Sequence, residues 1–511
     1  MTQAEEIAGQ AARTEWSDTL SRFAPLVIIA FFVLQVVSRV TSPGGVGLDE
    51  AEQMVATQTL ELGYGAQPPL YTWLQLAVFQ LTGPGKLGLA LLKHVFLAAT
   101  YLGIWVLARQ LGANRMTAAV AMFATLLLPS LSWESQRALT HTVLATALTV
   151  WTMNAAVYAA RTGQMRDYVL TGVIAGLGFI SKWNFGFIIA GLLVACLVRP
   201  ELRNRKALVA LGAALLVSAV PVIWAVGNWH LTTATAYKFD IDTESSFVAT
   251  SASALASLVK GIASIAALAI VVLLLVFRTS RTPGADGGAR QPEAGIVELA
   301  MLGAIGFVVV AMLATGATTV EERWLLPILV CLPMALTLRL MPWLTAARVR
   351  WFFGVAGVVL VAIAIAYPMN MRRGKSNPSY QSAPFEASAR ALGIETGLAV
   401  VSGTYLAGNL RLIRPELKVL TPGMPKLQLG GGAPDMVLWW SRDKTGAAPL
   451  ADLQRYLGTF KSEKAAALAF DVAARKFHGA LAPMIQWMSV ASSSNDIVFS
   501  RLAVMQPFVV S

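Results

Sequence analysis

The sequence predicts an α-helical polytopic membrane protein with a small α/β domain at its carboxyl end. Hydrophobic residues make up 56% of the 511 residues and charged residues only 13%, whereas soluble domains carry about 25% charged residues. The mean hydropathy of +0.61 agrees with this imbalance. The apolar residues gather in long runs, and the composition changes after Pro368. These observations favour a membrane protein over a large soluble one.

Apolar runs define about eleven predicted transmembrane helices, each close to the ~20 residues that cross ~30 Å of hydrocarbon. The runs are 24–40, 87–108, 116–130, 138–160, 168–181, 183–198, 207–227, 257–277, 296–316, 324–341 and 351–368. The apolar segment 71–81 is too short to cross, and we expect it to lie in the membrane interface.

Basic residues gather in alternate loops between these runs and so predict the orientation. Examples are Arg109 with Arg115, and the cluster from Arg199 to Lys206. Because cytoplasmic loops are enriched in Lys and Arg, residues 1–23 are predicted to be a cytoplasmic segment. The net charge of +12 follows this pattern, so it indicates membrane orientation and not nucleic-acid binding.

The chain is predicted to comprise a transmembrane domain at 24–368, with an external loop at 41–86, and an external domain at 369–511. An odd number of spans places the last domain on the same side as the loop. Within it, buried strands are predicted at 398–402, 417–420 and 435–440, and a helix at 404–413. Alternating strands and helices predict an α/β domain with parallel strands. The segment 278–295 has the composition of a flexible connector.

Two adjacent carboxylates, Asp49 and Glu50, follow the first apolar run. Charge at the edge of a membrane is costly and is retained mostly where it has a function. Further polar residues fall at predicted external loops or span ends, except for Lys93, which lies inside the predicted span 87–108. They are Tyr64, Gln67, Lys86, Lys93, Arg137, His141, Lys182 and Arg323. Such a set fits a substrate with an anionic head and a lipid tail.

The order of several short motifs resembles a known family. Leu48-Asp49-Glu50 followed by Gly63 to Leu70 (Gly-Tyr-Gly-Ala-Gln-Pro-Pro-Leu) is similar to the first external loop of bacterial relatives of the protein O-mannosyltransferases. These are GT-C glycosyltransferases, and they include the lipid A aminoarabinose and galacturonic acid transferases. The segments 86–93, 176–182 and 322–327 resemble further family motifs. Two departures are Gln67, where the family commonly has His, and His141, where it often has Asp.

The resemblance implies a GT-C fold in the bacterial inner membrane and an inverting transfer at its periplasmic face. The donor would be a sugar on a polyprenyl phosphate, and the acceptor a lipid A, core or other envelope glycolipid, or else a protein hydroxyl. Asp49 would be the base and Glu50 would position the acceptor or share a cation. Lys182, Arg323, Lys93 and Lys86 would bind the donor phosphate, since cations stabilise a developing phosphate dianion. Gln67, Tyr64, Arg137 and His141 would contact acceptor or sugar.

Structural roles compete with these functional ones. Asp49 could cap a helix, with Glu52 completing a capping box. Lys182 could extend its ammonium to the interface, and Arg323 could pair with Glu321 or Glu322. Lys93 could have a structural partner, and Tyr64 could be an interface aromatic. The histidines are expected to be hydrogen-bonding residues, although a divalent cation is possible.

A second hypothesis is a transporter or flippase for an anionic lipid, because charged residues within a membrane can mark a pathway. It predicts charges distributed through the spans and helices interrupted near the midplane. The sequence instead concentrates its charges at one edge, which favours the transferase.

Overall fold

The computed structural model describes most of the chain up to residue 373 and shorter segments beyond it. The described ranges are 3–200, 202–242, 244–277, 291–373, 385–391, 394–401, 403–421, 424, 436–440, 485–488 and 501–505. The chain divides into two compact units. The first contains Met1–Val37, Ala66–Tyr71 and Lys93–Ile365, and the second contains Ser38–Gly65, Thr72–Leu92 and Ala366–Ser511.

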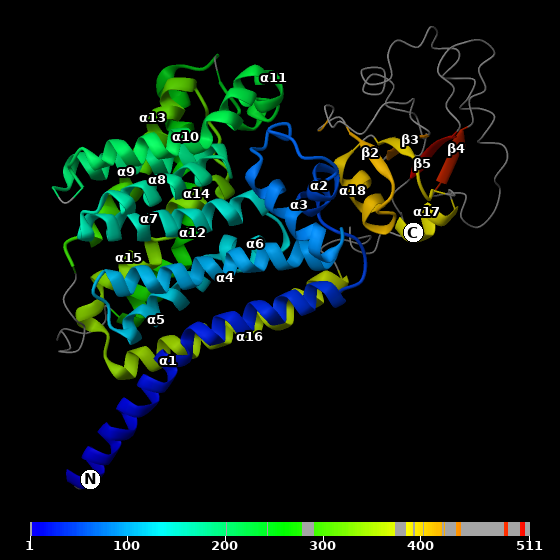
Figure 1. The fold of residues 1–511 in the computed structure, drawn as a ribbon. Coiled ribbons are helices and arrows are strands. Elements are labelled where there is room, and N and C mark those ends of the chain that lie inside the picture. The colour runs from blue at the N-terminus through cyan, green and yellow to red at the C-terminus, as the bar shows by residue number, and fades with distance from the viewer. Residues whose placement is uncertain are drawn as a thin grey trace. The chain divides into compact units, whose positions relative to one another are not determined.

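The first unit is a helical bundle (Figure 1). Its elements are most of α1 (Gln3–Thr41) and α4 (Lys86–Gln110), then α5 (Arg115–Ala124), α6 (Ser135–Arg137), α7 (Thr140–Thr162), α8 (Met165–Phe179), α9 (Gly186–Val198), α10 (Lys206–Gly227), α11 (Trp229–Thr232), α12 (Phe247–Phe277), α13 (Ala294–Thr315), α14 (Glu322–Leu329), α15 (Leu332–Arg339) and most of α16 (Ala346–Arg373). One apolar core extends through this unit.

Small residues allow helices of the bundle to approach closely. A Cβ atom added to Gly172 of α8 would overlap the backbone of Ala210 in α10. A Cβ atom on Gly191 of α9 would likewise overlap the backbone of Ala300 in α13. Helices in a membrane associate through such van der Waals packing, because lipid tails are as apolar as the side chains they would replace.

Seven helices in the described residues are long and apolar enough to span a membrane, or eight if one bent pair forms a single span. The prediction of a polytopic helical membrane protein is therefore confirmed, whereas the count of eleven is not. The run 116–130 breaks after Leu127 and turns through 77° into the segment Ser130–Arg137. The run 324–341 divides into α14 and α15, and α9 is a short apolar helix. Most of the predicted connector 278–295 lies outside the described residues.

The second unit contains most of the loop segment between α1 and α4 and the carboxyl-terminal α/β part (Figure 1). Its helices are α2 (Leu48–Ala56), most of α3 (Leu70–Thr82), α17 (Phe385–Ala391) and α18 (Thr404–Ile413). Its strands are β1 (Leu398–Val401), β2 (Lys418–Leu420), β3 (Met436–Trp440), β4 (Ile485–Met488) and β5 (Arg501–Met505), in the order β2-β1-β3-β5-β4. All neighbouring pairs are parallel except β4 with β5. These elements agree with the predicted strands and helix.

The second unit has an apolar core that joins the loop to the carboxyl-terminal part. Val55 and Tyr64 of the loop segment are buried in one cluster with Phe385, Leu406 and Leu410. Val46, Ala51 and Met54 form a second cluster with Phe79 and Leu89. Helix α2 therefore has a buried face.

Candidate functional site

Helix α2 carries the Asp49-Glu50 pair in its first turn. The helix begins at Leu48 after the N-cap residue Gly47, so Asp49 lies in the first turn and is not the N-cap residue. The capping explanation for Asp49 is therefore wrong. Asp49 is half-buried, and its carboxylate lies where the partial positive charge of the helix amino terminus favours an anion.

Glu50 is held in a buried ion pair with Arg39. Arg39 Nη2 lies 2.5 Å from Glu50 Oε2, and Arg39 Nε donates to Glu50 Oε1 at 3.4 Å. The two residues are 3% and 2% exposed. A bidentate pair of this kind fixes the carboxylate geometrically. Arg39 did not figure among the residues proposed from the sequence, although it lies at the predicted external end of the first span.

Lys86 and Tyr64 lie in the same unit as Glu50, and the side chains of both form hydrogen bonds with backbone groups. Lys86 Nζ donates to the carbonyl of Ser42 at 2.8 Å. The buried hydroxyl of Tyr64 donates to the Thr59 carbonyl at 2.8 Å and accepts from the Glu61 amide at 2.9 Å. Burial raises the pKa of Tyr64 to about 12. The contact of Tyr64 with a sugar stays a prediction, since both of these hydrogen bonds are internal to the loop.

Lys182 is the centre of a polar cluster in the first unit. Its ammonium donates to Thr142 Oγ1 at 2.5 Å and to the Arg323 carbonyl at 3.2 Å. Asn184 donates to the Trp324 carbonyl at 2.7 Å, which fixes the same two segments together. The structure thus brings Lys182 and the backbone of Arg323 into contact, although they are 141 positions apart in the sequence.

The cluster extends to His141 and to the segment that contains Gln67. His141 Nδ1 lies 3.3 Å from the Ser181 carbonyl oxygen, and its ring stacks at a tilt on Tyr71 with centroids 5.4 Å apart. The Leu70 amide donates to the Ile180 carbonyl at 3.1 Å. Trp183 Nε1 donates to the Ala66 carbonyl at 3.2 Å. The half-buried Gln67 is therefore fixed beside the chain segment 180–183.

Three other predicted cations have different surroundings. Arg323 forms a partly exposed ion pair with Glu321, Nε to Oε2 3.7 Å, which confirms the local pairing considered above. Arg137 pairs with Glu134 at 3.8 Å in the bent segment. Lys93 is fully buried in α4. Among the described residues, no group of three or more His, Cys, Asp or Glu side chains could hold a metal ion.

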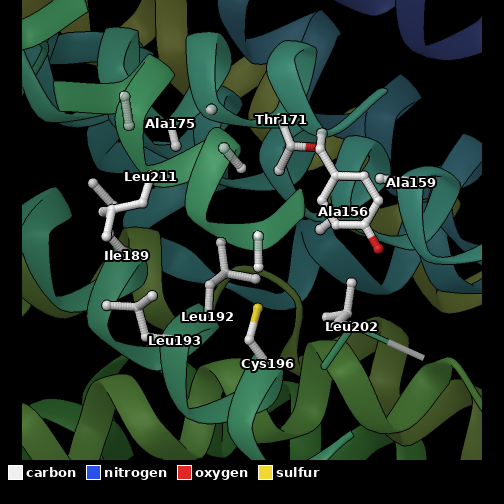
Figure 2. Close-up of a pocket in the computed structure, with 15 residues that line it drawn as sticks. Ala156, Ala159, Thr171, Ala175, Ile189, Leu192, Leu193, Cys196, Leu202 and Leu211 are labelled. Atoms are coloured by element: carbon white, nitrogen blue, oxygen red, sulfur yellow. The ribbon is translucent and has the colours of Figure 1, made fainter. Parts of the chain in front are cut away.

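The first unit also contains an apolar cavity of about 60 Å³ between α7, α8, α9 and α10 (Figure 2). Ala156, Thr171, Leu192, Cys196 and Leu211 point toward it. The predicted site residues lie elsewhere in the chain. The cavity is thus separate from the polar cluster around Lys182.

Comparison with known proteins gives consistent results. The family model described as dolichyl-phosphate-mannose-protein mannosyltransferase matches residues 66–224. The lipopolysaccharide core galacturonosyltransferase RgtA of Rhizobium johnstonii is 30% identical over 448 residues, covering 85% of this chain and 89% of RgtA. RgtB of the same organism, also a lipopolysaccharide core galacturonosyltransferase, is 28% identical over 86% of this chain and 92% of its own.

A solved structure shares the fold. The apo form of ArnT from Cupriavidus metallidurans matches with a TM-score of 0.50 and 15% identity, covering 94% of this chain and 97% of ArnT. The similarity to ArnT therefore concerns the fold, and the sequence match with RgtA concerns the family. The chain belongs to the same family of membrane glycosyltransferases as the lipopolysaccharide core galacturonosyltransferase RgtA.

Proposed function

We propose that this protein transfers a monosaccharide from a polyprenyl-phosphate donor to a lipid A, core or related envelope glycolipid. The observation that carries the proposal is the match over 85% of the chain to a lipopolysaccharide core galacturonosyltransferase. ArnT of Cupriavidus metallidurans binds undecaprenyl phosphate, which supports a donor of this chemical class. The reaction takes place at the periplasmic face of a bacterial inner membrane, with residues 1–23 in the cytoplasm and residues 369–511 in the periplasm.

Asp49 acts as the base in this proposal. Its carboxylate takes the proton of an acceptor hydroxyl while that oxygen attacks the anomeric carbon of the donor sugar. The bond between the anomeric carbon and the phosphate oxygen breaks, so polyprenyl phosphate leaves and the configuration inverts. Glu50, whose carboxylate is held by Arg39, positions the segment that presents Asp49.

The leaving phosphate gains negative charge as the bond breaks, and cations that are already in place lower the energy of that state. Lys182 and Arg323 supply this charge in the proposal. Contacts to Thr142 and to backbone orient the Lys182 ammonium beforehand. The guanidinium of Arg323 forms a partly exposed pair with Glu321, and such pairs are weak enough to exchange for a phosphate.

The base assignment is tested with purified protein, a polyprenyl-phosphate sugar and a glycolipid acceptor. Asp49→Asn is expected to lower kcat by about 10²–10⁴-fold, the usual contribution of a general base. Glu52→Gln is the matched control on the same helix and is expected to retain transfer. Near-normal transfer by Asp49→Asn would contradict the assignment. A protein acceptor that is glycosylated in place of the glycolipid would overturn the acceptor class.

The phosphate contacts have their own test. Lys182→Ala is expected to raise the KM for the donor, whereas Lys238→Ala, on the loop 228–246, is expected to leave it unchanged. The Lys238 ammonium lies 5.8 Å from the centroid of the Tyr237 ring. Its substitution by Ala therefore removes the same charge as Lys182→Ala. An unchanged donor KM in Lys182→Ala would remove Lys182 from the phosphate site.

A further inference from the structure

Helix α2, which carries Asp49 and Glu50, packs against α18 of the carboxyl-terminal part at backbone contact distance. Gly408 of α18 faces Ala51 of α2 so closely that a Cβ atom on Gly408 would lie 2.6 Å from the Ala51 carbonyl carbon. Real Cβ contacts are essentially never that short. The two helices therefore meet at a site where only glycine fits.

Asn409 of α18 holds the chain just before α2. The Val46 amide donates to Asn409 Oδ1 at 2.8 Å, and Asn409 Nδ2 donates back to the Val46 carbonyl at 3.1 Å. The same Nδ2 group donates to the Tyr405 carbonyl at 2.9 Å within α18. The side chain is fully buried. Its amide thus satisfies both backbone groups of Val46, which would otherwise be costly to bury.

Arg411 of α18 holds the other end of α2. Its guanidinium donates to the carbonyl of Met54, to that of Leu417 at 3.1 Å and to that of Pro415 at 3.4 Å. The side chain is buried, and burial lowers the pKa of Arg411 to about 10, so the group stays charged at neutral pH. A cation beside the carbonyls at the carboxyl end of a helix also stabilises the helix dipole.

Gln58, two residues beyond α2, pairs with β2. Gln58 Nε2 donates to the Val419 carbonyl at 2.8 Å, and the Val419 amide donates to Gln58 Oε1 at 2.8 Å. Hydrogen bonds therefore connect the carboxyl-terminal part to the chain at three places. They come from Asn409 before α2, from Arg411 in the last turn of α2, and from Val419 after α2.

We infer that α18 is the element that positions the acidic helix α2, with Asn409 and Arg411 as positioning residues for the transfer reaction. They touch backbone and not substrate, so they act through the placement of Asp49. This inference rests on the proposed function of Asp49. It assigns the carboxyl-terminal α/β part a role in catalysis at a segment that lies more than 350 positions earlier in the chain.

The test compares two glycine variants of the full-length protein. Gly408→Ala forces α18 away from α2, whereas Gly403→Ala is the matched control, because a Cβ atom there meets nothing within 4 Å. Asn409→Ala is the milder variant if Gly408→Ala does not fold. Hydrogen exchange of the backbone amides in residues 45–58 is measured without substrate, and kcat and donor KM are measured separately.

Gly408→Ala and Asn409→Ala are expected to speed exchange across residues 45–58 while exchange in α8–α10 stays unchanged. Their kcat is expected to fall by about 10–100-fold with the donor KM unchanged, since a displacement of about 1 Å can cost 10²-fold. Gly403→Ala is expected to match the wild type in both readouts.

Unchanged exchange or unchanged kcat in both Gly408→Ala and Asn409→Ala overturns the inference. Failure of the proposed function looks different: Asp49→Asn then retains transfer. The exchange measurement contains no substrate, so it reports on the attachment of α2 whatever the reaction proves to be.

Discussion

At the scale of single residues, Arg39 and Glu50 stand out because both charges are almost fully removed from water. Removing ions from water costs several kcal/mol each, and their attraction offsets this only where the geometry is good. Here two nitrogens of one guanidinium meet two carboxylate oxygens. The ion pair therefore links the end of α1 to α2, and each charge is stabilised in its buried position by the other.

Glu50→Gln and Arg39→Met are each expected to lower the stability of the protein by about 3–5 kcal/mol, because each removes the hydrogen-bonded partner of a buried charge. The double variant Arg39→Met/Glu50→Gln is expected to lose less stability than the sum of the two single losses. Thermal unfolding in detergent measures these differences. Arg390→Gln, which breaks an exposed pair with Glu386, serves as control and should change little. Additive losses in the double variant would refute the coupling.

Several candidate site residues could be proposed from the sequence because a charge at their position conflicts with the membrane. Lys182 falls on the predicted external side, which cations usually avoid, and the structure gives it two hydrogen-bond acceptors. The same reasoning applied to Arg39 would have found the partner of Glu50. Asn409 and Arg411 carry no such signal. They form hydrogen bonds with backbone groups more than 350 positions away. Every residue type has these backbone groups, so such a contact produces no recognisable sequence motif.

At the scale of elements, glycine determines which helices of the bundle can touch. Gly172→Ala in α8 is expected to destabilise the protein by about 1–3 kcal/mol, the usual cost of overpacking, because its Cβ would overlap the Ala210 backbone. Gly212→Ala in α10 is the matched control, since nothing lies within 4 Å of its Cβ. There the better helix propensity of Ala should leave stability equal or slightly higher.

Thermal unfolding of both variants in the same detergent is the measurement. Equal midpoints for Gly172→Ala and Gly212→Ala would show that α8 and α10 do not depend on this close approach.

Hydropathy predicted where apolar helices lie but not where they break. Helix α18 agrees with the predicted range 404–413, because strand, glycine and helix signals agree there. The run 116–130 instead ends in a short 3-10 turn (Thr125–Leu127), and Pro129 begins a π-helical turn (Ser130–Glu134). Pro327 and Pro333 lie in the two halves of the run 324–341. Proline lacks the backbone N–H that donates a helix hydrogen bond, but it does not make the run less apolar. The mean hydropathy of the run therefore stays high across the break.

At the scale of the whole molecule, the orientation across the membrane can be tested by single cysteines in a Cys196→Ala/Cys331→Ala background. Ser246→Cys is expected to react with a membrane-impermeant maleimide on intact spheroplasts. Arg205→Cys is expected to react only after permeabilisation, because the basic cluster around it is predicted to be cytoplasmic. Both positions are exposed. The reverse pattern would invert the topology.

The attachment of Val46 to Asn409 also has a consequence for biogenesis. The two residues are 363 positions apart, and a ribosome adding 5–20 residues per second needs roughly 20–70 s to make that length. Throughout this interval the nascent α2 lacks the amide of Asn409 and the carbonyl contacts of Arg411. The helix with the acidic pair is therefore among the first segments synthesised and among the last to assume its final environment.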